Sequence, residues 1–344
     1  MIDRQGTIAA FLDRQGLAGA GRRPLAGDAS ARHYERLLPR KPGQPESLIL
    51  MDSPYPVEDV FPFIAVAGLL KAIGLTVPEI VASEPARGLL LLEDLGDSTF
   101  SRLMEAGTDP AGLYALATDV LTALHDRFDP VRAAPLALPR YDARLFVDQV
   151  MLFADVYVPA ALGRPLSEGE RAALEYAWTE VVTQAVAAVP ASFLHRDFHV
   201  DNLMRLPGRE GVAACGILDF QSAGIGPVSY DLVSLLEDAR RDVPAAISAA
   251  MVERYLQAFP ELDPHGFTLS CAVLGAVRHA RVIGIFARLA LFQGRRGYLV
   301  HLPRVWRLLE GQLAKPALAP VAAWFDRHLP VAARAAFDIP GVVP

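Results

Sequence analysis

The spacing of apolar residues changes near residue 95 and divides the chain into two regions. Before residue 95, short apolar runs bounded by Gly, Pro and polar residues predict β-strands. Two amphipathic helices interrupt these runs, and the longer one carries Val60, Ile64, Ala67, Leu70 and Ile73 on one face. The predicted strands are residues 24–38 (two strands joined by a tight turn), 47–52, 78–83 and 88–92, and the predicted helices are residues 7–15 and 57–73.

After residue 95 the apolar positions recur at helical spacing over longer segments. One segment opens with Ser167 and Glu170, the residue pair of a capping box. The predicted helices are residues 109–127, 142–162, 167–189, 230–240, 244–259, 266–292, 302–313 and 321–328. Short strands are expected around residues 193–219, and residues 54–56 and 130–139 are rich in Pro and predict loops.

Composition limits the classes of function. Of the 344 residues, 52% are hydrophobic and 21% are charged, as in globular proteins. A net charge of -6 lacks the basic footprint of a nucleic-acid-binding protein. The N-terminus lacks the pattern of a signal peptide, and the best candidate for a membrane span, residues 282–291, is short and holds Arg288. Two cysteines indicate neither a disulfide framework nor a zinc site. We therefore expect a soluble, cytoplasmic protein without nucleic-acid or membrane partners.

Chemistry-bearing residues concentrate in one stretch of the second region. An apolar lead-in delivers His195 and Asp197, four residues separate Asp197 from Asn202, and a later apolar run ends in Asp219. A carboxylate base, an amide and a strand-terminal acid in this order are typical of a kinase catalytic loop and its metal-binding aspartate. We expect Asp197 to accept the proton of a substrate hydroxyl, and Asn202 and Asp219 to hold Mg²⁺ against the phosphates. The alternative is a capped loop with surface carboxylates.

Together the two regions predict an α+β, protein-kinase-like bilobal fold. Residues 1–95 form a β-rich nucleotide-binding lobe, and residues 96–344 form a mainly helical catalytic and substrate-binding lobe, with a hinge near Glu93. The turn between the first two strands holds small and polar residues whose backbone N–H groups approach an anion easily. These residues, Gly27, Asp28, Ala29 and Ser30, are candidates for phosphate binding, although an ordinary hairpin explains them equally well.

Several segments resemble the aminoglycoside phosphotransferase and choline kinase superfamily. The similar segments are residues 194–203, 217–220, 226–232 and the hinge-like 89–96. The resemblance covers nearly the whole chain and implies ATP or GTP as co-substrate, with the base near backbone groups of Glu93 and Leu95. The superfamily has a phosphate-binding lysine on the third strand, and this chain has none there. We expect Arg32 or Arg36 to replace it, with solvated strand arginines as the alternative.

Within the superfamily the chain resembles bacterial N-acetylmuramate/N-acetylglucosamine anomeric kinases of cell-wall recycling. The similar segments are residues 27–32, 50–54, 218–221, 226–236, 278–289, 298–299 and 302–304. The resemblance implies phosphorylation of the sugar 1-hydroxyl. Candidate substrate-binding residues are His199 and Asp201 in the loop and Arg278 and His279 in the late helix, although a core helix would also explain the last two.

Two other functions stay open at this point. One is a kinase of the same fold that acts on another alcohol, such as an aminoglycoside, choline or homoserine. The other is a nucleotide-binding pseudokinase, which only the absent third-strand lysine favours. The sequence does not indicate the oligomeric state or the choice between ATP and GTP.

Overall fold

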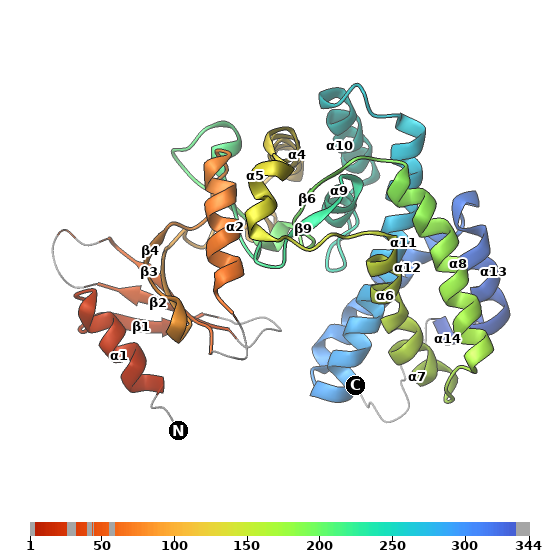
Figure 1. The fold of residues 1–344 in the computed structure, drawn as a ribbon, viewed down its shortest axis with the longest axis horizontal. Coiled ribbons are helices and arrows are strands. Elements are labelled where there is room, and N and C mark those ends of the chain that lie inside the picture. The colour runs from red at the N-terminus through yellow and green to blue at the C-terminus, as the bar shows by residue number, and fades with distance from the viewer. Residues whose placement is uncertain (1–3, 26–31, 40–42, 44, 55–58, 335–344) are drawn as a thin grey trace. The chain divides into compact units, whose positions relative to one another are not determined.

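The computed structural model describes residues 4–25, 32–39, 43, 45–54 and 59–334 (Figure 1). The chain forms two compact units. The first unit comprises Met1–Val120 and Val200–Ser222, and the second unit comprises Leu121–His199 and Ala223–Pro344. The division into lobes after residue 95 remains a prediction about domains.

An antiparallel sheet organises the first unit. Its strand order is β1-β2-β3-β5-β4, so the central strand β3 pairs with β2 and with β5. The strands are β1 (Gly21–Pro24), β2 (His33–Leu38), β3 (Leu48–Asp52), β4 (Ile80–Glu84) and β5 (Leu89–Glu93). The strands β2, β3, β4 and β5 were predicted, whereas β1 lies before the first predicted strand, which was expected to begin at residue 24. The register brings Met51 opposite Leu90 in the middle of the sheet.

One face of this sheet is covered by helix α1 (Arg4–Arg14), which lies against it in Figure 1. The helix contributes Ile8, Phe11 and Leu12 to a buried cluster, and the sheet contributes Leu37, Leu48, Leu50, Leu89 and Leu91. Because side chains alternate along a strand, Met51, Leu90 and Leu92 belong to the other face, and they too are buried. Both faces are therefore apolar, as the uninterrupted run of leucines in β5 predicts.

Three helices and a hairpin complete the first unit. They are α2 (Phe61–Ala72), α3 (Phe100–Glu105), the N-terminal part of α4 (Pro110–Arg127), and the strands β7 (Leu203–Arg205) and β8 (Cys215–Ile217). The helix predicted at residues 57–73 begins later, at Phe61. Helix α3 was not predicted because six residues are too short for a clear period, although its cap is regular: Thr99 accepts a hydrogen bond from the N–H of Arg102 over 3.2 Å.

The second unit is built around one long helix, α11 (Pro264–Gln293), much of which is buried. The packed helices around it share an apolar core that includes Phe153, Trp178, Trp306 and Phe325. The other elements of this unit are α5 (Pro130–Ala133), α6 (Ala143–Leu152), α7 (Val158–Leu162), α8 (Glu168–Ala187), β6 (Ala191–Leu194), β9 (Gly224–Pro227), α9 (Ser229–Leu236), α10 (Ala245–Ala258), α12 (Leu302–Leu313), α13 (Ala319–His328) and α14 (Val331–Arg334). The capping box predicted at Ser167 and Glu170 is present at the start of α8.

Three sequence expectations for this unit were wrong in detail. The helix predicted at residues 142–162 is interrupted by a π-helical turn at Phe153–Tyr157. The helix predicted at residues 230–240 ends at Leu236, and the predicted loop at residues 130–139 contains the short helix α5. The π-turn faces Gly284, where an added Cβ would lie 2.8 Å from the backbone nitrogen of Phe153. The backbones of the two helices are therefore in close contact at this point. The spacing of apolar residues in the sequence does not predict such a contact.

Two helical segments of the described residues are long and apolar enough to cross a membrane by length and composition, contrary to the sequence expectation. They are Ala143–Leu162 and Pro264–Gln293. In the second segment, 78% of the most apolar window is buried inside the protein. The core helix of a globular unit has this property, so length and composition alone are weak grounds for a membrane span.

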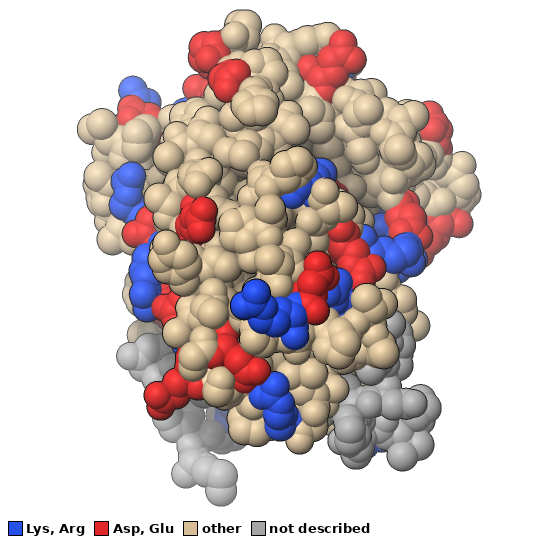
Figure 2. All heavy atoms as spheres, turned by 90° about the vertical axis from the view of Figure 1, so that its right-hand side faces the viewer, with Lys and Arg blue, Asp and Glu red and all other residues tan. Residues whose placement is uncertain are grey.

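The face drawn in Figure 2 carries acidic and basic side chains interspersed among wide neutral areas. Charged side chains of the second unit form ion pairs: Arg171 pairs with Asp155 over 2.8 Å, and Arg164 pairs with Glu170 over 2.8 Å. Such exposed pairs contribute little to stability.

Candidate active site

Two predicted metal ligands, Asn202 and Asp219, flank the β7–β8 hairpin of the first unit. Leu203 pairs with Ile217 in the hairpin, and the N–H of Leu218 donates to the carbonyl of Asn202 over 2.9 Å. The antiparallel register therefore places the backbone of Asn202 beside the residue that precedes Asp219. One amide and one carboxylate form the oxygen donor set that Mg²⁺ takes together with phosphate oxygens and water, so these residues fit that ion.

Asp219 has an unusual backbone. Its φ is 60°, in the left-handed region that non-glycine residues seldom adopt. The Nε2 of Gln221 donates to Asp219 Oδ1 over 2.6 Å. Strained backbone of this kind is frequent at functional sites, where the surrounding structure fixes it.

The segment predicted to meet the nucleotide base follows β5. The N–H of Glu93 donates to the carbonyl of Glu79 over 2.8 Å, and its carboxylate accepts from Arg209 Nη2 over 2.9 Å. Leu95 packs over β8, because an added Cβ at Gly216 would lie 2.7 Å from Leu95 Cδ1. Contacts within the first unit therefore hold both residues in place. Their contact with a nucleotide remains a prediction.

Arg36, on β2, holds this same segment. Its Nε donates to Asp94 Oδ2 over 2.6 Å, and its Nη1 donates to Asp97 Oδ2 over 2.8 Å. Nη2 also donates to the carbonyl of Gly96 over 3.2 Å. The hydrogen bonds to Asp97 and Asp94 raise the pKa of Arg36. Because its guanidinium is engaged by two acids, the structure speaks against Arg36 as the phosphate-binding cation, and Arg32, directly before β2, remains the predicted one.

In the second unit, strand β6 leads into the loop that carries Asp197. The N–H of His195 donates to Asp231 Oδ2 over 2.6 Å, and the N–H of Arg196 donates to Asp231 Oδ1 over 2.8 Å. Arg196 has a φ of 79°, and its guanidinium lies 5.0 Å from the centre of the Tyr141 ring. Asp231 is fully buried in α9 and braces the loop. Burial raises the pKa of Asp231 to about 7, although the two backbone N–H groups act in the opposite direction.

Asp197 is half-buried among cations of the second unit. Burial would raise the pKa of Asp197, but Arg281, Arg196, His199 and Arg278 together lower it below its ordinary value. The carboxylate is therefore ionised at neutral pH, which is the form that accepts a proton. Arg281 lies on α11, and Asp197 and the hydrogen-bonded Tyr230 raise the pKa of Arg281 against the effect of its burial.

The two candidate residues on α11 differ in their surroundings. Arg278 donates to the carbonyl of Glu237 over 3.3 Å and acts electrostatically on Asp197. The side chain of His279 is fully buried, and its Nε2 lies 2.5 Å from Glu237 Oε2. Gln312 of α12 donates to the other oxygen of Glu237 over 2.6 Å. His279 therefore lies in the interior of the unit, and its predicted contact with a sugar is not supported, because this face of α11 packs against α9 and α12.

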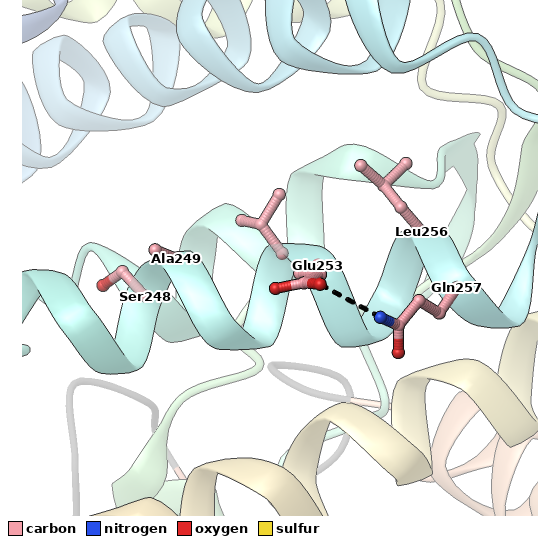
Figure 3. A pocket seen from close by; sticks show the side chains of 6 residues that line it. Ser248, Ala249, Glu253, Leu256 and Gln257 are labelled. Atoms are coloured by element: carbon pink, nitrogen blue, oxygen red, sulfur yellow. Dashed lines mark hydrogen bonds between the residues drawn. The ribbon is translucent and has the colours of Figure 1, made fainter.

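A surface hollow of about 620 Å³ lies over helix α10, and none of the candidate site residues lines it (Figure 3). Its lining comes from a single helix, and its one ionisable group, Glu253, accepts a hydrogen bond from Gln257 over 3.1 Å. Because no polar groups from other elements converge there, we do not assign this hollow to catalysis.

The sequence matches the model of a known family, described as the phosphotransferase enzyme family, over residues 21–265. The chain belongs to this family. Similar proteins include an N-acetylmuramate/N-acetylglucosamine kinase of Caulobacter vibrioides, which is 39% identical over 96% of this chain and 98% of its own length. A protein with the same name from Pseudomonas aeruginosa is 37% identical over 86% of this chain and 85% of its own length.

Solved structures agree with the phosphotransferase fold. The choline kinase LicA of Streptococcus pneumoniae has a TM-score of 0.60 at 12% identity, covering 90% of this chain and 99% of its own. The GDP complex of wild-type aminoglycoside 2'-phosphotransferase-IIIa has a TM-score of 0.57 at 13% identity, covering 91% and 99%. The predicted α+β, kinase-like fold is thereby confirmed.

The structure distributes the predicted site residues of the phosphotransferase over both units. Asn202, Asp219 and Asp201 lie in the first unit, and Asp201 belongs to the 3₁₀ turn Val200–Asn202. Asp197 and His199 lie in the second unit, where His199 is buried. The candidates Gly27, Asp28, Ala29 and Ser30 fall outside the described residues.

Two charged residues that follow α9 in the phosphotransferase were not assigned a site role from sequence. Asp238 follows α9 and is buried to 1% exposure, and Arg240 stands two residues later. Both act electrostatically on His199. An acidic pair, Glu237 and Asp238, at the end of an otherwise apolar helix was the available signal, but sequence alone does not tell a surface acid from a buried one.

Proposed function

We propose that this phosphotransferase is an ATP- or GTP-dependent sugar kinase that phosphorylates the anomeric 1-hydroxyl of N-acetylmuramate, N-acetylglucosamine or both. The observation that carries this proposal is the 39% identity, over nearly the whole length of both chains, to a kinase named for these two sugars. The arrangement around Asp197 supports it, because a half-buried carboxylate whose pKa is lowered by cations suits an acceptor hydroxyl of raised acidity. The proposed setting is cell-wall recycling in the cytoplasm.

In the proposed reaction the sugar O1 forms a bond to the γ-phosphorus of the nucleotide. The bond between the γ-phosphorus and the β,γ-bridging oxygen breaks, and its electron pair leaves with the nucleoside diphosphate. The proton of the 1-hydroxyl passes to Asp197. The brace from Asp231 holds the backbone of His195 and Arg196 and so limits the positions that the neighbouring Asp197 carboxylate can adopt.

The residues proposed to hold Mg²⁺ are Asn202 and Asp219. Mg²⁺ bound there would neutralise charge on the β- and γ-phosphates. The N–H of Leu218 donates to the carbonyl of Asn202, and this hydrogen bond joins the two backbone segments that carry the ligands beside the hairpin. The left-handed backbone of Asp219 sets the direction of its carboxylate.

For the nucleotide we propose the backbone of Glu93 and Leu95 at the base, and Gly27, Asp28, Ala29, Ser30 and Arg32 at the phosphates. Similar solved structures include a GDP complex and an ADP-bound form of aminoglycoside phosphotransferases, which supports a nucleotide co-substrate without choosing its base. Arg36 supports this arrangement indirectly, because it fixes Asp94 and Asp97 just beyond Glu93. We further propose that the protein has no nucleic-acid or membrane partner, in keeping with its net charge of -6.

A parallel assay tests this function. The purified protein is incubated with Mg²⁺ and either ATP or GTP, and with N-acetylmuramate, N-acetylglucosamine, choline or kanamycin as acceptor. We expect a sugar 1-phosphate in the ³¹P spectrum and loss of the sugar's reducing-end reactivity. Turnover on choline or kanamycin alone would overturn the sugar assignment. If the wild type and Asp197→Asn were equally inactive on every acceptor, the protein would be a binding module.

A further inference from the structure

Two arginines on one face of helix α11, Arg278 and Arg281, form an arginine pair without an acidic partner in contact. They stand three positions apart, so their Cβ atoms lie about 5–6 Å from each other. Arg278 is 4% exposed, and Arg281 is half-buried. Within the part of the chain that the structure describes, neither guanidinium forms an ion pair with a carboxylate. The hydrogen bond of Arg278 goes to an uncharged acceptor, the carbonyl of Glu237, over 3.3 Å.

This arrangement of charges is unfavourable for the protein alone. A buried cation loses its hydration, and proteins usually offset that loss with an opposite charge in contact. Arg334, which is 8% exposed, follows this rule, because it pairs with Asp326 over 2.7 Å. The arginine pair does not follow it, and like charges three residues apart on a helix also repel each other. Two adjacent guanidinium groups kept at this cost are typical of a site for an anionic ligand.

Contacts within the second unit link the arginine pair to the loop that carries the proposed base. Helix α11 packs against α9 (Figure 1), and Arg278 binds the backbone at the end of α9. In the same helix α9, Asp231 holds the loop that carries Asp197 through two backbone N–H groups. Burial raises the pKa of Asp197, and Arg281 is the strongest of the cations that lower it. The arginine pair and the proposed proton acceptor therefore belong to one region of the second unit.

The distribution of the other proposed site residues indicates which anion fits. The proposed Mg²⁺ ligands Asn202 and Asp219 and the proposed phosphate-binding Arg32 belong to the first unit. Cations beside the proton acceptor therefore fit an anion on the acceptor sugar. The two sugars in the name of the Caulobacter vibrioides relative differ in one group, because N-acetylmuramate carries a lactyl ether with a carboxylate and N-acetylglucosamine has none. A guanidinium binds a carboxylate with two parallel hydrogen bonds.

We propose that Arg278 and Arg281 form a subsite for the carboxylate of the acceptor sugar, and that they make the protein favour N-acetylmuramate over N-acetylglucosamine. The effect on turnover rests on the proposed sugar-kinase function, whereas the binding of the carboxylate does not. N-acetylmuramate neutralises both guanidinium groups when it binds. N-acetylglucosamine leaves them buried without an opposite charge, and this difference selects between the two sugars.

The first test compares kcat/KM for the two sugars in Arg278→Met and Arg281→Met, which remove the charge and keep an unbranched side chain. We expect the ratio of N-acetylmuramate to N-acetylglucosamine to fall by about 10- to 100-fold in each variant. The ratio cancels any effect on Asp197 that both sugars share. Arg278→Lys should keep part of the preference, because it retains the charge without the planar fork. Arg288→Met, at an exposed position of the same helix, is the matched control and should leave the ratio within about twofold.

A structural role of the arginines predicts a different result. Equal losses on both sugars would mean that the arginine pair supports the loop or the phosphoryl group, and would overturn the subsite. Without sugar, Arg278→Met should keep or raise the unfolding midpoint, because it removes a buried charge that has no acidic partner in contact. A lower midpoint together with an unchanged sugar ratio would show that Arg278 only packs the helices. If Arg278→Met does not fold, Arg281→Met decides the ratio.

The second test measures binding without turnover. Calorimetry of the whole wild-type protein compares N-acetylmuramate with its lactyl methyl ester, which lacks the negative charge. We expect the acid to bind about 10- to 100-fold more tightly than the ester, and this difference to shrink in Arg278→Met and Arg281→Met. Equal affinity of the wild type for acid and ester would overturn the subsite. If neither sugar is phosphorylated, the proposed function fails, and the calorimetry still decides whether the arginine pair binds the carboxylate.

Discussion

The two units hold their charged side chains in different ways. In the first unit, Arg36 meets two carboxylates: the Asp94 side chain is 4% exposed, and the Asp97 side chain is 61% exposed. In the second unit, two carboxylates meet N–H groups: the buried Asp231 takes two from the backbone, and the half-buried Glu237 takes those of His279 and Gln312. Water and salt share the stabilisation of exposed pairs, whereas a buried carboxylate depends wholly on its fixed donors. Removing the buried Asp231 of the second unit should therefore cost more than removing the exposed Asp97 of the first.

The largest effect should come from a substitution of Asp197, which lies in the loop that Asp231 holds. Asp197→Asn removes the proton acceptor, and we expect turnover to fall by about 10²- to 10⁴-fold. Unfolding midpoints and nucleotide binding should be close to the wild type, because the substitution keeps the side-chain size. Steady-state kinetics together with calorimetry of nucleotide binding measure both. A variant with unchanged turnover would show that another group takes the proton.

Removing the brace itself is the next test. Asp231→Ala leaves the N–H groups of His195 and Arg196 buried without an acceptor, and we expect it to lower the free energy of unfolding by about 2–4 kcal/mol. Denaturant unfolding measures this value, and turnover should fall as well because the loop loses its support. Asp97→Ala in the first unit is the comparison, with an expected loss below about 1 kcal/mol. Equal losses would contradict the difference between the units.

A pair of glycine substitutions compares helix packing in the two units. Gly284→Ala places a Cβ 2.8 Å from the backbone nitrogen of Phe153, and we expect a loss of about 1–3 kcal/mol, measured by thermal or denaturant unfolding. Gly68→Ala in α2 has no atom within 4 Å of the new Cβ. It should stabilise the protein by about 0.5–1 kcal/mol through helix propensity. A stable Gly284→Ala would mean that the π-turn can shift at little cost.

The two kinds of carboxylate should also respond to pH with opposite sign. The pKa of Asp231 is raised from 3.8 to about 7 in the folded state, so its stabilising contribution is complete below pH 3.8 and is lost as the pH rises through about 7. The hydrogen bond from Arg36 lowers the pKa of Asp97, so its contribution is present above pH 3.8 and is lost as the pH falls. Unfolding of Asp231→Asn between pH 4 and 8, and of Asp97→Asn between pH 2 and 5, measures both contributions. If both variants kept the wild-type dependence of the unfolding free energy on pH, the assignment of these two pKa shifts would be refuted.

Much of the fold was predictable because the signals are local. The leucine runs of β3 and β5 predicted buried strands, and the apolar period predicted α11 to within a few residues. The π-turn at Phe153–Tyr157 and the short helix α3 were missed, since neither spans enough residues to set a period. The late start of α2 and the early end of α9 are boundary errors at positions where the composition gives no clear cap.

The sequence by itself predicted the chemistry, because Asp197, Asn202 and Asp219 stand at the spacing that is typical of a kinase catalytic loop and its metal-binding aspartate. Only the tertiary structure decided the partners of the surrounding side chains. Arg36 is engaged by acids about 60 residues away, and His279 by Glu237, 42 residues away. Burial and pairing between distant segments leave no local pattern, since they depend on which helix faces pack together. The same packing placed Asp238 in the interior of the second unit, among the charges that act on His199.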